Sequence, residues 1–370
     1  MATDATAQRA GQLDAIRAVC VLAVIFSHTI TEGHAVGGYR FFELGSYAVS
    51  MFFVLSAFLI TSQLLTANVR RHEVGEGVCE PLKRFYVRRC LRLLPAYFVA
   101  LAAAAAVDLP KVREELGWHA FQLTNFYFAA NPDHEKFSAA GHLWSLSMEW
   151  QFYLVWPFVV MFSGIRLLLC IILTLICTMT IVGVFEGILP SIVIAANVPA
   201  SVLSLSTGAL LSCAIFCDWD LSWMKSAFWP SIAIFLGGVS AYALGFGLVG
   251  DRFAMVTSLA LNVVFACMVY FASKGITGWP ALFLNDRRAQ YLGVISYGIY
   301  LYHQFIIEGW VKANSALGLP EMKWGIRFTL CIAIVSIAVA ALSWRVFEKP
   351  INDLRHRFQY RPRRSAPQRA

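Results

Sequence analysis

An arginine and a histidine share one face of the first apolar segment of the chain. Arg17 and His28 are eleven residues apart, almost three turns of an α-helix, so a helix projects both from one face about 16 Å apart along its axis. An ionisable side chain within an apolar helix is costly and is usually functional. Because imidazole titrates near neutral pH, His28 is a candidate general base. The structural alternatives are a hydrogen bond within a helix bundle for His28 and snorkelling toward lipid headgroups for Arg17.

Four arginines follow within the segment Lys83–Pro95. Arg84, Arg88 and Arg92 recur every four residues, and Arg89 precedes Arg92 by three. Helical spacing gathers these guanidinium groups toward one side, an arrangement suited to bidentate phosphate binding. A general excess of positive charge beside a membrane explains part of the pattern.

A histidine, a serine and a glutamate lie on one face of the segment Gly141–Pro157. His142, Ser145 and Glu149 follow the spacing i, i+3, i+7, which places them on one side of a helix. A carboxylate beside a histidine in an apolar run is hard to explain by packing alone. The pattern therefore favours a functional role for this face.

Another polar stripe lies within the segment Gly293–Gln304. Ser296, Tyr300 and His303 follow the spacing i, i+4, i+7. Each tyrosine taken alone is explained as an anchor at the membrane interface. The combined stripe in the middle of an apolar segment instead indicates a polar site.

The composition is that of an integral membrane protein. Of the 370 residues, 58% are hydrophobic and 14% are charged, and the mean hydropathy is +0.63, whereas soluble domains contain about 25% charged residues. The net charge of +8 is concentrated in segments typical of cytoplasmic loops, so we expect no nucleic-acid partner. The nine cysteines include no CxxC pair and no Cys/His cluster with zinc spacing, so we expect neither disulfides nor a metal.

Ten apolar segments are close to the length of about 20 residues that crosses a bilayer. An even number places both termini on one side, and most of the 30 Lys and Arg residues then fall on that side, which the positive-inside rule makes cytoplasmic. We therefore expect an all-α, polytopic membrane protein with about ten transmembrane helices and both termini in the cytoplasm. Residues 1–350 form the membrane domain, and residues 351–370 form a basic, disordered tail. The ten segments are Leu13–Thr31, Tyr47–Leu65, Leu91–Val107, Leu146–Phe162, Leu167–Phe185, Ile192–Phe216, Trp229–Leu248, Phe253–Ser273, Tyr291–Val311 and Gly325–Phe347.

Six motifs occur along the chain in a characteristic order, and through them the chain resembles the acyltransferase 3 family of integral membrane acyltransferases. The first is Arg17 with His28 eleven positions later. The others are FFVLSAFLI from Phe52, RRCLRLLP from Arg88, HLWSLSMEWQFYL from His142, ISYGIYLYH from Ile295 and FEKP from Phe347. The resemblance covers nearly the whole chain. It implies a ten-helix fold in the bacterial cytoplasmic membrane that moves an acyl group, usually acetyl, from acyl-CoA to a hydroxyl of a sugar or glycan.

The resemblance, together with the polar stripes, assigns a role to each candidate residue. His28 is the catalytic histidine. Glu149 is a second catalytic group, and either Glu149 or a tyrosine orients the imidazole. The acyl-CoA head group binds Arg17, Arg89 and Arg92. The acceptor site is lined by His142, Ser296, Tyr300 and His303. Acyl-CoA is then a substrate rather than a resident cofactor, and the partners are a carbohydrate or lipid-linked glycan acceptor and membrane lipid.

The chain departs from the family pattern at several positions. Ser50 stands where an acid commonly precedes the FF pair, Ala57 stands where glycine is usual, and Trp150 stands where a second acid often follows Glu149. Position 50 therefore receives no role. Direct transfer and an acyl-tyrosine relay both remain open, as do the acceptor and the acyl chain length.

Two other function classes fit parts of the pattern. A transporter or exporter of a small metabolite or glycan shares the polar cavity but does not need the arginine and histidine set. A purely structural membrane protein predicts that substitution of Arg89 or Glu149 changes stability alone. The main hypothesis is an integral membrane O-acyltransferase.

Overall fold

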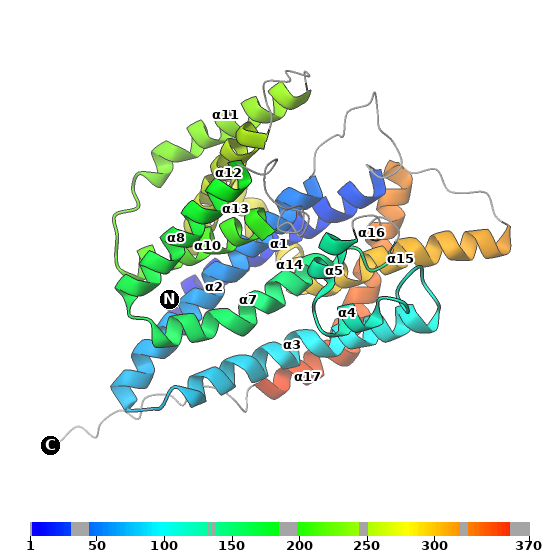
Figure 1. Ribbon diagram of the computed structural model, residues 1–370, viewed down its shortest axis with the longest axis horizontal. Coiled ribbons are helices and arrows are strands. Elements are labelled where there is room, and N and C mark those ends of the chain that lie inside the picture. Colours follow the sequence, from blue (N-terminus) through cyan, green and yellow to red (C-terminus); the bar gives the residue numbers. More distant parts are fainter. Residues whose placement is uncertain are drawn as a thin grey trace.

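Apolar segments of about twenty residues or more form the long helices of the protein. The computed structural model describes residues 2–30, 44–131, 134, 138–184, 198–243, 251–318 and 325–355. Within these ranges every regular element is a helix (Figure 1), which confirms the predicted all-α class. Residues 356–370, most of the predicted basic tail, lie outside the described ranges.

The described helices fall into long helices and short connecting ones. The long ones are α1 (Ala2–Ile30), α2 (Leu44–Val74), α3 (Cys79–Ala106), α7 (Leu143–Phe162), α8 (Ile165–Val184), α10 (Val198–Phe216), α11 (Met224–Ala243), α12 (Asp251–Lys274), α15 (Ser296–Leu317) and α16 (Ile326–Ser343). The short ones are α4 (Leu116–Ala120), α5 (Thr124–Ala130), α13 (Trp279–Leu284), α14 (Arg287–Val294), the π-helical turn η3 (Trp344–Glu348) and α17 (Lys349–Asp353).

Among the described residues, seven helices are long and apolar enough to cross a membrane. They correspond to α1, α2, α3, α8, α10, α12 and the run from α16 to α17. The protein is therefore polytopic, as predicted, while the count of ten spans and the sidedness of the termini stay predictions. Of the three remaining predicted spans, Leu146–Phe162 lies within α7, and part of Trp229–Leu248 lies within α11.

The ninth predicted span is not one continuous helix. The segment Tyr291–Val311 is divided at Ile295, where α14 ends and α15 begins. Asp286 caps the start of α14 by accepting hydrogen bonds from the backbone N–H groups of Arg288 and Ala289, a common helix-start motif. The break makes Ser296 the first residue of α15, beside the arginine-bearing helix α3.

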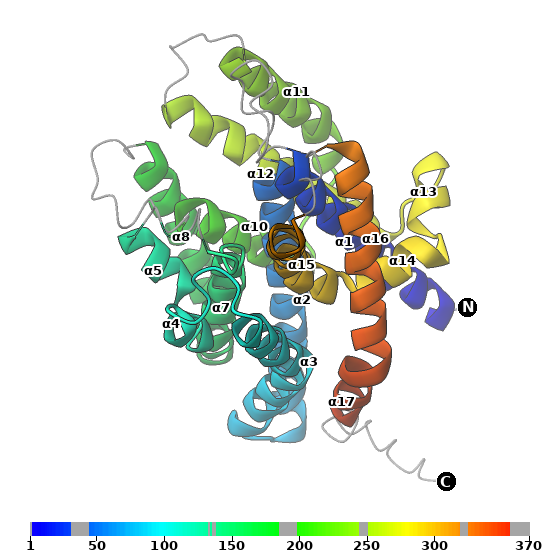
Figure 2. The same cartoon turned by 90° about the vertical axis from the view of Figure 1, so that its right-hand side faces the viewer.

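Helix α15 runs through the interior of the bundle. Figure 2 shows it nearly end-on, with α1, α2, α3 and α16 around it, and it packs against α1, α3 and α16.

Two glycines bring other helices into close contact. A Cβ on Gly208 of α10 would overlap the Val54 carbonyl of α2, and a Cβ on Gly293 of α14 would overlap the backbone of Asp14 on α1.

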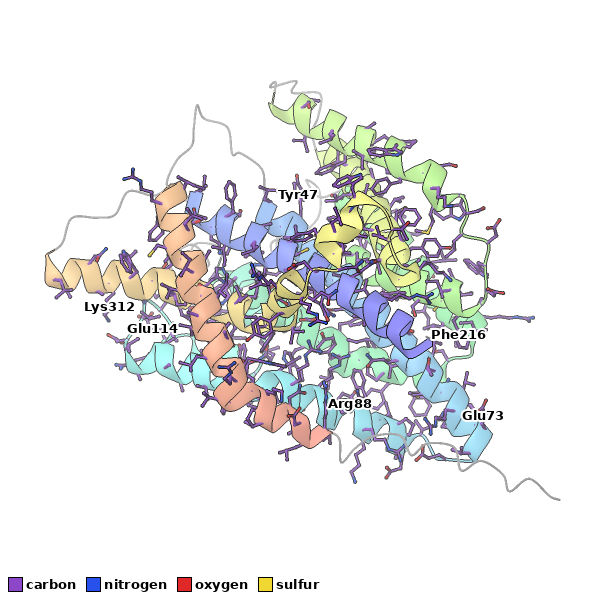
Figure 3. The ribbon with its side chains drawn as sticks, turned by 180° about the vertical axis from the view of Figure 1, so that it is seen from behind. Tyr47, Glu73, Arg88, Glu114, Phe216 and Lys312 are labelled. Carbon is purple, nitrogen blue, oxygen red and sulfur yellow. The ribbon has the colours of Figure 1, made fainter. Side chains whose placement is uncertain are left out.

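The two ends of the molecule differ in what they carry. Figure 3 shows Glu114 and Lys312 at one end of the molecule and Glu73 toward the other. Lys312 donates hydrogen bonds to the carbonyls of Val107 and Asp108, at 3.0 and 2.5 Å. At the other end α2 has 31 residues, about 46 Å of helix, and so extends beyond a hydrocarbon core of about 30 Å.

Candidate active site

His28 points from α1 toward α15 and contacts two of its side chains. His28 Nδ1 lies 3.1 Å from Gln304 Oε1 and 3.0 Å from His303 Nε2. His303 is fully buried, and its Nδ1 lies 2.6 Å from the Tyr300 carbonyl oxygen. The histidine at the end of the predicted α1 stripe thus meets the histidine at the end of the predicted α15 stripe.

A hydroxyl pair joins α7 to α15 next to these histidines. The hydroxyls of Ser145 and Tyr300 lie 2.6 Å apart, and each lies 3.1 Å from the His142 carbonyl oxygen. The His142 ring packs on the rings of Tyr300 and His303, and its Nε2 donates to the Leu301 carbonyl at 3.1 Å. The stripe predicted on α7 and the one predicted on α15 therefore form one polar layer.

Glu149, one helical turn after Ser145 on α7, accepts two side-chain hydrogen bonds. Its Oε1 accepts from Ser56 Oγ at 2.5 Å and from the Tyr153 hydroxyl. The guanidinium of Arg89 lies over the Tyr153 ring, 5.5 Å from its centroid, and donates to Gln63 Oε1 at 3.3 Å. Glu149 is thus held beside the arginines and does not contact His28 in the described structure.

A cavity of about 160 Å³ brings the arginines and the polar layer together. We call it the inner pocket. Three arginines line it, Arg17, Arg89 and Arg92, together with the hydroxyl-bearing side chains Tyr300, Ser145 and Ser296 and the carboxylate of Glu149. Of the described residues that line the inner pocket, three are cationic and Glu149 alone is anionic, so the cavity suits an anionic ligand.

A second cavity of about 440 Å³ adjoins the inner pocket. We call it the basic mouth. It shares Gln63, Arg89 and Arg92 with the inner pocket, so the two cavities share a wall. Its other arginines come from three places in the chain: Arg70 at the end of α2, Arg84 and Arg88 at the start of α3, and Arg355 after α17.

Among the described residues that line the two cavities, His28 does not occur. The inner pocket reaches Val49 on α2. A Cβ on Gly45, four residues earlier, would lie 3.9 Å from His28 Nε2. Four residues of helix rise about 6 Å, so His28 lies about one turn beyond the end of the inner pocket. Two predicted acceptor-site residues, His142 and His303, likewise lie next to His28 and do not line the inner pocket.

Sequence reasoning missed several residues of the cavities. Ser56 and Gln63 are seven residues apart on α2, a helical spacing of polar side chains in an apolar span that could have been noticed. Arg70 and Arg355 lie on segments far apart in the sequence, and no local pattern relates them. Asp14, which is not among the predicted site residues, pairs with the pocket residue Arg17 at 2.6 Å.

A buried acidic cluster lies outside the two cavities, in the segment that follows α3. Glu115 is fully buried and accepts from Ser138 Oγ at 2.6 Å and from His134 Nδ1 at 3.1 Å. His119 Nε2 lies 3.4 Å from the same carboxylate. Burial acts to raise the pKa of Glu115, but the nearby His119 ring and the hydrogen bonds from Ser138 and His134 outweigh it and leave that pKa below its ordinary value. Within the described ranges, no group of three or more His, Cys, Asp or Glu side chains has the geometry to hold a metal ion.

Comparison with known proteins agrees with the resemblance seen in the motifs. The family model of the acyltransferase 3 domain matches residues 11–345. The chain belongs to the acyltransferase 3 family. No solved structure matches the chain.

The curated relatives of this acyltransferase 3 chain include enzymes that are named for O-acetylation. The putative peptidoglycan O-acetyltransferase YrhL of Bacillus subtilis is 28% identical over 92% of this chain and 54% of its own length. The peptidoglycan O-acetyltransferase OatA of Listeria monocytogenes is 27% identical over 92% of this chain and 55% of its own length. For the O-acetyltransferase OatA of Staphylococcus aureus the figures are 24%, 92% and 56%. The chain thus spans about half the length of these relatives.

Proposed function

We propose that this acyltransferase transfers an acyl group, specifically an acetyl group, from acyl-CoA to a hydroxyl of a glycan at the membrane. The observation that carries the proposal is the pair of adjoining cavities. Arginines from α1, α2, α3 and the end of α17 line the two cavities, and hydroxyls of the polar layer, about one helical turn from His28, line the inner pocket. A ligand with an anionic head and a long reactive arm matches this arrangement.

Coenzyme A has the chemistry that the two cavities accept. Its phosphates are multivalent anions, and guanidinium groups bind phosphate oxygens through paired hydrogen bonds. Arg89 and Arg92 border both cavities, so they bind phosphates at the entrance to the inner pocket. Arg17 lines the inner pocket but not the basic mouth, and we assign it to the innermost phosphate. The pantetheine arm then extends past Tyr300 and Val49 toward His28.

His28 acts as the general base in a direct transfer. Its Nε2 takes the proton of the acceptor hydroxyl while the oxygen attacks the thioester carbonyl. The new C–O bond forms, the C–S bond breaks, and the CoA thiolate leaves. The proton on His28 then passes to that thiolate, which restores the neutral imidazole and releases CoA with a free thiol.

The remaining predicted residues support this reaction from the walls of the site. Glu149 lies among the arginines, so we propose that it orients the Arg89 guanidinium and the thioester arm rather than the imidazole. Tyr300 and Ser296, on the wall of the inner pocket, contact the substrates there. His142 and His303 lie behind this wall, and we propose that they support the site from there without contacting the acceptor.

The names of the relatives support a glycan as the acceptor. Two of them are named as peptidoglycan O-acetyltransferases, and a polymer or lipid-linked glycan reaches a membrane enzyme from the aqueous face opposite the donor. We propose that the protein works in the bacterial cytoplasmic membrane with its basic mouth on the cytoplasmic side, where acyl-CoA is made.

A transfer assay tests the proposal. The purified protein is reconstituted in lipid nanodiscs with radiolabelled acetyl-CoA and glycan oligomers, and label in the glycan is followed over time. We expect His28→Ala to lose transfer by about 100- to 10,000-fold, the usual contribution of a general base. His72→Ala, at an exposed histidine in the last turn of α2, is the matched control and retains the full rate. Full transfer by His28→Ala would overturn the assignment of the base. Glycan transport by the wild type in sealed liposomes, without acyl transfer, would favour an exporter.

A further inference from the structure

We propose that His303 and Gln304 hold the imidazole of His28 in a single tautomer, with its proton on Nδ1 and its lone pair on Nε2. The inference rests on the proposed function, because it assigns positioning residues to the base named there. It is carried by the hydrogen-bond geometry between α1 and α15.

The ring of His303 is neutral and carries its proton on Nδ1. Its Nδ1 lies 2.6 Å from the carbonyl oxygen of Tyr300, and a carbonyl only accepts, so Nδ1 carries a proton. His303 is fully buried, and neither of its hydrogen-bond partners in the described structure, this carbonyl and the ring of His28, carries a negative charge. A buried charge without a counter-charge is costly, so the ring is neutral. Its Nε2 therefore has a lone pair and accepts a hydrogen bond.

The amide of Gln304 turns its oxygen toward His28. Its Nε2 donates to Glu308 Oε1 at 3.3 Å, which directs the amide nitrogen away from His28. The amide oxygen then faces His28 Nδ1 at 3.1 Å. An amide oxygen only accepts. Gln304 is thus a second acceptor for the same nitrogen.

These two acceptors decide the state of His28. Its Nδ1 lies 3.0 Å from His303 Nε2, which has a lone pair, and 3.1 Å from Gln304 Oε1, so Nδ1 must donate. In a neutral imidazole the other nitrogen is then unprotonated. His28 Nε2 therefore has a free lone pair, as a general base requires.

The free nitrogen faces the start of α2. A Cβ on Gly45 would lie 3.9 Å from His28 Nε2, and glycine has no side chain to cover that nitrogen. The acceptor hydroxyl therefore approaches along the backbone at Gly45, on the side away from His303. When Nε2 takes the hydroxyl proton, the two acceptors on Nδ1 stabilise the positive charge of the ring, and Glu308 lies next along the chain of hydrogen bonds.

Variants of His303 separate an acceptor role from a packing role. His303→Phe keeps a ring but removes the acceptor, whereas His303→Gln places an amide oxygen near the position of the lost Nε2. We expect His303→Phe to lower kcat about 100-fold while the KM for acetyl-CoA stays within about twofold. We expect the kcat of His303→Gln to be at least about tenfold higher than that of His303→Phe. Gln304→Leu tests the second acceptor and provides a result if His303→Phe does not accumulate in the membrane.

A spectroscopic measurement reads the tautomer without turnover. Solid-state NMR of ¹⁵N-histidine protein in lipid, with the His28 signals assigned by their loss in His28→Ala, distinguishes a protonated from an unprotonated ring nitrogen. We expect Nδ1-protonated His28 in the wild type and a mixture of tautomers in His303→Phe. Wild-type kcat in both His303→Phe and Gln304→Leu, equal losses in His303→Phe and His303→Gln, or an Nε2-protonated wild-type ring would overturn the proposal. Full transfer by His28→Ala would overturn the proposed base alone, because the tautomer is still read directly.

Discussion

At the scale of single residues, the balance of charge in the inner pocket is its most informative property. Glu149 is the one carboxylate among the described residues that line it, and Ser56 and Tyr153 hydrogen-bond it. Those two hydrogen bonds keep the carboxylate in place beside Arg89 without a direct ion pair in the described contacts. The guanidinium of Arg89 therefore remains able to bind a phosphate.

Arg92 gives the sharpest prediction at this scale, because it borders both cavities. Hydrogen bonds to charged groups contribute about 1.5–3 kcal/mol, so we expect Arg92→Gln to raise the KM for acetyl-CoA about 10- to 100-fold. Arg166→Gln, at an exposed arginine near the start of α8, is the control and leaves the KM unchanged. An unchanged KM in Arg92→Gln would place the donor elsewhere.

The sequence predicted which residues share a helix face but not which faces meet. Arg17 and His28 are on one stripe of α1, as their spacing predicts. That His28 contacts His303 depends on how α1 packs against α15, a tertiary arrangement that no spacing within either segment encodes. The same reason hid Arg355 from the predicted arginine cluster, because only the fold brings the end of α17 to the basic mouth.

At the scale of helices, close backbone contacts set the position of α10 against α2. A Cβ on Gly208 would overlap the Val54 carbonyl, so Gly208→Ala forces the two helices apart. We expect a loss of about 1–3 kcal/mol in stability and a lower melting temperature in detergent. Gly237→Ala on α11, where a Cβ meets nothing within 4 Å, is the matched control and keeps or raises the melting temperature. Equal effects of the two substitutions would contradict the close contact.

The π-helical turn η3 buries a carboxylate that the sequence motif FEKP did not explain. Glu348 is 5% exposed, and it accepts a hydrogen bond from Ser343 Oγ at 2.7 Å. Ser343 is in turn hydrogen-bonded to the hydroxyl of Tyr302 on α15, at 2.8 Å. The motif at the end of α16 therefore joins this helix to the interior helix α15, which carries His303.

The acidic cluster at Glu115 joins the residue before α4 to His134 and Ser138, in the segment between α5 and α7, through hydrogen bonds. Because the pKa of Glu115 lies below its ordinary value, its stabilising contribution is present above that ordinary value and is lost as pH falls through the lower folded pKa. We expect Glu115→Gln to lower stability by about 1–3 kcal/mol near neutral pH. The difference in melting temperature from the wild type should vanish at pH values below the folded pKa.

The exposed neighbour Glu114 provides the control for this cluster. Its side chain is 64% exposed and pairs with Lys111, and exposed ion pairs contribute little to stability. Glu114→Gln should therefore leave the melting temperature unchanged at every pH. A pH-independent difference between Glu115→Gln and the wild type would show that the carboxylate charge plays no part.

At the scale of the whole molecule, composition and hydropathy were sufficient to predict an all-helical membrane protein. They were less informative about where helices end. The break at Ile295 follows Gly293, whose backbone packs directly on Asp14 of α1, and apolarity alone suggested one span where there are two helices. The length of α2, which carries Arg70 to the basic mouth, was likewise underestimated, because polar residues near its end resemble a loop.

Cysteine labelling tests the predicted orientation. Cys79 is exposed as the first residue of α3, on the predicted cytoplasmic side. A variant that keeps Cys79 alone should react with a membrane-impermeant maleimide only after the cells are permeabilised. A cysteine-free variant with Glu114→Cys, on the predicted outer side, should react in intact cells. The reverse pattern would invert the orientation.

The most direct test of the account is a cryo-EM map of the protein in nanodiscs with saturating acetyl-CoA. We expect density for the phosphates about 3 Å from the guanidinium groups of Arg89 and Arg92, with the arm running past Tyr300 and the acetyl group on the Gly45 side of His28. Phosphate density at the opposite end of the molecule, near Glu114, or an inner pocket that stays empty at saturation would contradict it.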